Sequence, residues 1–174
     1  MNTANKLTIF RVILVPVFLI VLYMGFNGSN YVALAIFIIA SITDAVDGYI
    51  ARSRKQITDF GKFLDPLADK ILVLAAMLWF VETGVLPAWA VLIVIIREFA
   101  VTALRLVAAS RGDVIAAGLS GKIKTVASMV CLIILFLEIP VALVYVCIAV
   151  IVATTVVSGV DYFVKNRKSL DWEK

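Results

Sequence analysis

The sequence predicts an all-α polytopic membrane protein, with six transmembrane helices around a polar chamber that faces the cytoplasm. Three observations lead to this fold class. The chain of 174 residues is 63% apolar and 16% charged, with a mean hydropathy of +1.08, which is typical of multi-span membrane proteins. Its apolar residues gather in six stretches, and its positive charges avoid the tight turns between them. We expect residues 1–174 to form a single domain.

The six apolar stretches approach the length that crosses a bilayer, which is about 17 to 25 residues. They lie at residues 7–24, 31–50, 67–81, 88–109, 123–137 and 141–162. The third and the fifth are short, so we expect their helices to include polar flanking residues. Turn-forming residues predict tight connections near 25–30, 82–87 and 138–140. Residues 51–64 and 110–122 predict longer, polar connections.

The distribution of positive charge predicts how the chain is oriented. None of the 16 Lys and Arg residues lies in the three tight turns. Positive residues favour the cytoplasmic side, so both termini and the active site are expected there, in a multi-pass protein of the cell membrane. Orientation in the bilayer therefore explains the net charge of +4, and we expect no nucleic-acid partner.

Four helices are predicted to bring polar residues to one depth. Counted from the side without basic residues, Arg11, Asp44, Asp69 and Lys124 each lie about a dozen residues along their helices. At about 1.5 Å per residue, this places each group roughly 18 to 20 Å from the outer face of a core about 30 Å thick. A shared depth some 10 Å inside the cytoplasmic boundary predicts the polar chamber.

The acidic signature is the set Asp44, Asp47, Asp65 and Asp69, which lies between two apolar stretches. A carboxylate near hydrocarbon is costly unless it is paired, bound to metal or facing water. Spacings of three and four residues place each pair on one face of a helix. Hard oxygen ligands, in a chain with no His, indicate Mg²⁺ or Mn²⁺. The alternative is that salt bridges to nearby Arg and Lys residues explain these acids.

Small residues and a cation follow the first two aspartates. Gly48 and Ala51 leave that helix face without bulk, so that phosphates can approach closely. Arg52 supplies a cation for them. The whole pattern is D-x2-D-G-x2-A-R-x8-G-x3-D-x3-D and includes Gly61. It resembles the signature of the CDP-alcohol phosphotransferases, membrane enzymes that join a CDP-activated alcohol to a second alcohol and release CMP.

This resemblance implies a role for each signature residue. Asp44, Asp47 and Asp65 would bind two divalent ions that hold the CDP pyrophosphate, and Asp69 would also accept the proton of the attacking hydroxyl. The resemblance also implies a homodimer. The residues assigned to the CDP-lipid are Thr43, Gly48, Ala51, Arg52 and Gly61.

Segments outside the signature indicate the identity of the acceptor, which is the second alcohol in the reaction. Three segments resemble those of family members whose donor is CDP-diacylglycerol and whose acceptor is sn-glycerol 3-phosphate. They are N-K-L-T-I-F-R, I-R-E-F-A-V-T-A-L-R and G-K-I-K-T. Arg105, Lys122 and Lys124 would then bind the acceptor phosphate. The alternative is that these three cations only set the topology.

Four further residues are possible supports of the site: Asn5, Thr8, Arg11 and Arg97. Arg11 has an alternative role, in which it reaches lipid headgroups from the end of its helix. Arg97 lies near the middle of its helix, where an unpaired cation is disfavoured, so we expect it to pair with a carboxylate.

Other functions are compatible with parts of the sequence. Inositol phosphate, serine or phosphatidylglycerol are alternative acceptors for the same chemistry. Intramembrane charges also occur in ion-coupled transporters, although the outer halves of these helices carry few polar residues. A catalytically silent membrane scaffold is disfavoured because all eight signature positions are filled.

Overall fold

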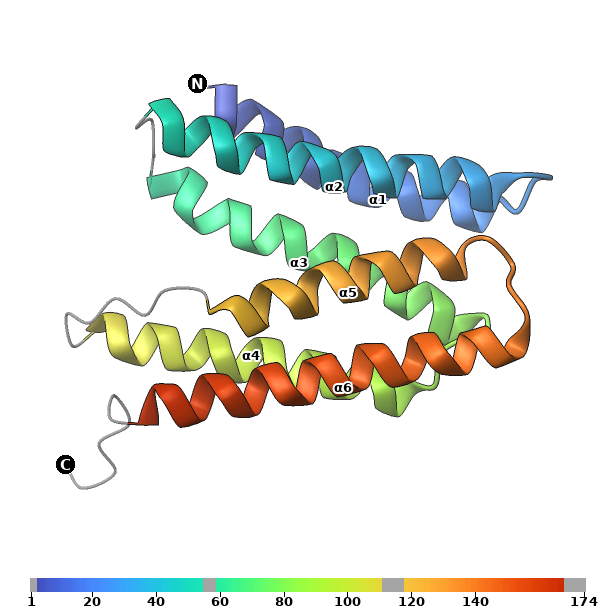
Figure 1. Ribbon diagram of the computed structural model, residues 1–174. Helices are drawn as coiled ribbons and strands as arrows, with labels where there is room; N and C mark the ends of the chain where they lie inside the picture. The colour runs from blue at the N-terminus through green and yellow to red at the C-terminus, as the bar shows by residue number, and fades with distance from the viewer. Residues whose placement is uncertain (1–2, 55–58, 111–117, 168–174) are drawn as a thin grey trace. The chain divides into compact units, whose positions relative to one another are not determined.

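The computed structural model describes the backbone of residues 3–54, 59–110 and 118–167, and the side chains of 9–43, 70–110 and 118–167. This part of the chain is helical and contains no strand (Figure 1). The prediction of six helices is therefore confirmed. Their bounds are Thr3–Met24 (α1), Ser29–Arg54 (α2), Asp59–Glu82 (α3), Ala88–Ser110 (α4), Leu119–Leu135 (α5) and Val141–Lys165 (α6).

The two short apolar stretches become longer helices, as predicted. Helix α3 begins at Asp59 and so includes the polar residues that precede its apolar run. Helix α5 begins at Leu119 and includes both lysines of the G-K-I-K-T segment. The chain divides into two compact units, Met1–Met77 and Leu78–Lys174, which are described separately.

In the first unit, α1 and α2 form a helical hairpin. Gly25 and Gly28 have φ angles of 58° and 90° in the connection, a region that favours glycine, and the turn closes tightly there. Phe18 of α1 and Phe37 of α2 are fully buried, with ring centroids 6.2 Å apart. The hairpin therefore has its own apolar seam.

In the second unit, α6 packs against both α4 and α5. Leu132 of α5 and Ile151 of α6 belong to the buried residues of this unit, as do Val94 and Leu104 of α4. At the other end of α5, Phe136 contacts Phe80 at the end of α3, with ring centroids 4.7 Å apart. These contacts fix the three helices that carry most of the described polar residues.

Among the described residues, one helix, Val141–Lys165, is both long and apolar enough to cross a membrane. Ile9–Met24 and Ser29–Thr43 are shorter apolar helical stretches. Many large apolar side chains on α4 and α6 are exposed, among them Phe99, Leu106 and Val157 at 70%, 67% and 64%. An exposed apolar surface of this kind suits contact with lipid.

Candidate functional site

The acidic signature lies on two helices of the first unit. Asp44 and Asp47 are in α2, and Asp65 and Asp69 are in α3. The helical backbone gives each pair the predicted register on one face. The four side chains lie outside the described residues, so their convergence on a metal stays a prediction. A set of four carboxylates is nevertheless a donor set that suits Mg²⁺ or Mn²⁺.

The residues assigned to the CDP-lipid lie on the same two helices. The Thr43 side chain is described, and its Oγ1 donates a hydrogen bond to the carbonyl oxygen of Ile39 at 2.6 Å. The other four assigned residues lie in helical segments whose side chains are not described: Gly48, Ala51 and Arg52 in α2, and Gly61 in α3.

Helix α1 carries the N-terminal supporting residues. Asn5 and Thr8 are in its first part, where the side chains are not described. Arg11 is completely buried. A buried guanidinium is costly unless its charge is compensated, so this position requires a polar or anionic environment.

A three-residue ion cluster joins α4 to α5 in the second unit. One carboxylate oxygen, Oε1 of Glu98, accepts hydrogen bonds from Arg97 Nη1 at 2.9 Å and from Lys124 Nζ at 2.8 Å. The side chains of Arg97, Glu98 and Lys124 are only 12%, 15% and 6% exposed. Arg97 thus pairs with a carboxylate, as its position in the sequence predicts. We call this set the Glu98 cluster.

Arg97 is also fixed to α6. Its Nη2 donates a hydrogen bond of 2.6 Å to the hydroxyl of Ser158. Gly159 lies where a Cβ atom would be 3.3 Å from Arg97 Cγ, and Gly121 of α5 lies where one would be 3.5 Å from Arg97 Nη2. Gly159 therefore leaves space for the arginine side chain, whereas a Cβ atom at Gly121 would make an ordinary van der Waals contact with it.

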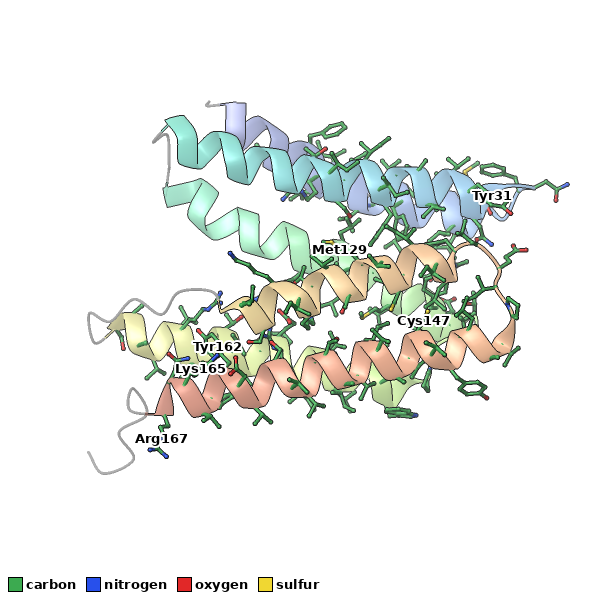
Figure 2. All side chains as sticks on the ribbon, in the orientation of Figure 1. Tyr31, Met129, Cys147, Tyr162, Lys165 and Arg167 are labelled. Atoms are coloured by element: carbon green, nitrogen blue, oxygen red, sulfur yellow. The ribbon has the colours of Figure 1, made fainter. Side chains whose placement is uncertain are left out.

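The other two predicted acceptor cations have different surroundings. Arg105 donates from Nε to the Tyr162 hydroxyl at 2.9 Å, and its guanidinium carbon lies 5.4 Å from the centre of the same ring. Tyr162 is near the end of α6 (Figure 2) and is 4% exposed. Lys122 is exposed on the first turn of α5.

One more polar contact joins the start of α5 to the end of α6. The Ser120 hydroxyl donates to Asp161 Oδ2 at 2.5 Å, and Lys165 Nζ lies 2.8 Å from Asp161 Oδ1. The Ser120 hydrogen bond holds the start of α5, which contains Lys122 and Lys124, against α6, whereas the Lys165 contact lies within α6. Arg105, Lys122 and Lys124 thus belong to one unit, although each has a different environment.

Sequence reasoning did not identify three of the residues that fix these cations. Ser158, Gly159 and Tyr162 lie in an apolar helix that the sequence presents mainly as a membrane span. A usable signal was the adjacent small pair Ser158 and Gly159, because small residues let membrane helices approach closely. Glu98 follows Arg97 directly in the sequence, but its contact with Lys124 of another helix was not predicted.

Comparisons with known proteins agree with the signature. A family model described as CDP-alcohol phosphatidyltransferase matches residues 1–158. The chain is 46% identical to a Bacillus subtilis protein named CDP-diacylglycerol--glycerol-3-phosphate 3-phosphatidyltransferase, over 97% of each chain. A Haemophilus influenzae protein of the same name is 45% identical over 75% of this chain and 73% of its own. A Mycobacterium tuberculosis protein named probable phosphatidylglycerophosphate synthase is 40% identical, over 97% and 83%.

Proposed function

Because the chain belongs to the CDP-alcohol phosphatidyltransferase family, we propose that it transfers the phosphatidyl group of CDP-diacylglycerol to sn-glycerol 3-phosphate. The products are phosphatidylglycerophosphate and CMP. The observation that carries this proposal is the complete eight-position signature on α2 and α3, in a chain that matches relatives named for this reaction along almost its whole length.

The reaction is a displacement at phosphorus. A hydroxyl oxygen of the acceptor forms a bond to the phosphorus of the phosphatidyl group, and the bond from that phosphorus to the CMP oxygen breaks. Asp69 accepts the proton that the hydroxyl loses, and CMP leaves with the electron pair of the broken bond. Such a reaction depends mainly on in-line positioning and on neutralisation of charge.

The acidic signature would hold two Mg²⁺ or Mn²⁺ ions through Asp44, Asp47, Asp65 and Asp69. When bound, these ions supply positive charge to the pyrophosphate of the donor. Arg52 adds a cation of its own, and Gly48 and Ala51 let the nucleotide approach the backbone of α2. Thr43 and Gly61 complete the proposed CDP-lipid site.

Arg105, Lys122 and Lys124 are proposed to bind the phosphate of the acceptor. This phosphate distinguishes glycerol 3-phosphate from serine, so its recognition needs cations outside the signature. Arg105 and Lys124 are already held by Tyr162 and Glu98, which reduces the motion they lose when the phosphate binds. Arg11, Asn5, Thr8 and Arg97 support the site.

We place the enzyme in the cell membrane with six spans and with its termini and active site in the cytoplasm. The apolar length of α6 and the exposed apolar side chains of α4 and α6 support a membrane location. The absence of Lys and Arg from the tight turns supports the orientation. The homodimer rests on the resemblance, and light scattering of the detergent-purified protein tests it.

A direct assay tests the proposed reaction. The purified protein is incubated with Mg²⁺ or Mn²⁺, CDP-diacylglycerol and one acceptor at a time, and CMP release is measured. We expect release with sn-glycerol 3-phosphate to exceed release with serine, inositol phosphate or phosphatidylglycerol. Preferential release with one of the other three acceptors would contradict the assigned substrate, and no release with any would contradict the reaction.

A further inference from the structure

Glu98 of α4 lies at the centre of the contacts that fix Lys124. The same carboxylate oxygen contacts Arg97 Nη1 at 2.9 Å and Lys124 Nζ at 2.8 Å, so one side chain of α4 sets the position of a lysine on α5. Bonds between charged groups in surroundings this buried are stronger than on an exposed surface. Glu98 therefore links α4 to α5 through its ion pair with Lys124.

The Glu98 side chain is itself held by contacts that lead to α6. Arg97 contacts Glu98 with one terminal nitrogen and the Ser158 hydroxyl with the other, at 2.9 and 2.6 Å. The Ser158 side chain is buried, at 1% exposure. The position of the carboxylate is thus set by a chain of contacts that runs from α6 through Arg97.

Lys124 requires an anionic partner because it is only 4% exposed. A buried ammonium that lacks an anionic partner is driven towards its neutral form or out of its position. Within the described part of the chain, Glu98 is the acceptor that Lys124 contacts. A lysine has three N–H donors, so two are left for a ligand.

We infer that Glu98 is a positioning residue for the acceptor: through Lys124, it holds one of the cations that bind the acceptor phosphate. This inference rests on the proposed function. It also predicts the direction in which acceptor binding changes when the carboxylate is removed. A carboxylate that faced the phosphate directly would repel it, so its removal would strengthen acceptor binding. A carboxylate that acts through Lys124 gives the opposite result, because its removal weakens acceptor binding.

The experiment uses the full-length enzyme with Mg²⁺, and CMP release is measured while each substrate is varied. For Glu98→Gln we expect the KM for glycerol 3-phosphate to rise at least tenfold. The KM for CDP-diacylglycerol should stay within twofold. Glu98→Asp keeps the charge and should recover part of the loss. An unchanged or lower acceptor KM, or an equal rise for both substrates, would overturn the inference.

A matched control separates this effect from the loss of any ion pair. Lys165→Gln removes the Lys165 contact with Asp161, in which the Lys165 side chain is 66% exposed. We expect both KM values of this variant to match those of the wild type. If Glu98→Gln has no turnover, Glu98→Asp carries the test, and a selective rise in its acceptor KM supports the inference.

A double substitution tests whether Glu98 acts through Lys124. In a Lys124→Ala background, adding Glu98→Gln should change the acceptor KM by less than twofold, because the lysine that Glu98 positions is already gone. If the two substitutions raise the acceptor KM by factors that multiply in the double variant, the inference is overturned. An active wild type with unaffected Glu98 variants overturns this inference alone, whereas a wild type inactive with glycerol 3-phosphate overturns the proposed function as well.

Discussion

Replacing Ser158 with alanine tests the contact that fixes Arg97 to α6. The substitution removes one oxygen atom from a side chain that is 1% exposed, and leaves the rest of the packing in place. It also removes the 2.6 Å hydrogen bond from Arg97 Nη2, whose side chain is 12% exposed. Hydrogen bonds to charged groups contribute about 1.5–3 kcal/mol, so we expect Ser158→Ala to lower the free energy of unfolding by that amount.

Thermal unfolding in one detergent measures this loss. For a chain of this size, 1 kcal/mol corresponds to about 2–4 °C, so the unfolding midpoint should fall by about 3–12 °C. Thr154→Val in the same helix is the control, because the Thr154 hydroxyl donates to carbonyl oxygens of its own helix, at 2.7 Å to Val150. A midpoint for Ser158→Ala within 1 °C of the control would refute the argument that this bond stabilises α4 against α6.

Four further predictions concern the proposed reaction. Asp69→Asn should abolish CMP release while binding of CDP-diacylglycerol, measured by equilibrium binding, largely persists; retained turnover would contradict its role as proton acceptor. Lys122→Ala should raise the KM for glycerol 3-phosphate several-fold more than that for CDP-diacylglycerol, and equal rises would argue against a separate acceptor site. Tyr162→Phe keeps the ring beside Arg105 but removes the 2.9 Å hydrogen bond; because Arg105 is exposed to water, this bond contributes less than the buried Arg97 bond, and a loss of about 0.5–1.5 kcal/mol should raise the acceptor KM by about two- to tenfold. An unchanged acceptor KM would show that this bond does not position Arg105. Chelation with EDTA should stop CMP release, and added Mg²⁺ or Mn²⁺ should restore it; activity that survives chelation would contradict the metal assignment.

The six helices were predictable because apolar runs and turn residues are local properties of the sequence. The same holds for the helix that each signature residue occupies. The sequence predicted that α3 extends into its polar flank, but not that it begins at Asp59, because its polar first turns carry no apolar signal. The arrangement of the carboxylates depends on how α2 and α3 meet, and spacing within each helix does not determine that.

The contacts around Arg97 show a second limit of sequence reasoning. A mid-helix arginine in an apolar run requires a partner, and this requirement predicted the pairing with an acid. The contact with Ser158 joins residues 61 positions apart, so it depends on the rotation of α4 relative to α6. Nothing in the local pattern fixes that rotation. The close approach of Gly159 to the arginine became interpretable only once the helices were in place.

The three proposed acceptor cations differ in what they contribute, because their surroundings differ. Lys124 is buried and held by Glu98, and Arg105 is held by the hydroxyl and the ring of Tyr162. Both are oriented before a ligand binds, so their hydrogen bonds can select the shape of an acceptor phosphate at a low cost in conformational entropy. Lys122 and Arg105 are both exposed, but within the described part of the chain no hydrogen bond orients Lys122, so its charge acts mainly through attraction that salt screens. In the proposed site, discrimination between acceptors therefore resides in Lys124 and Arg105, and Lys122 contributes mainly to drawing the anion in.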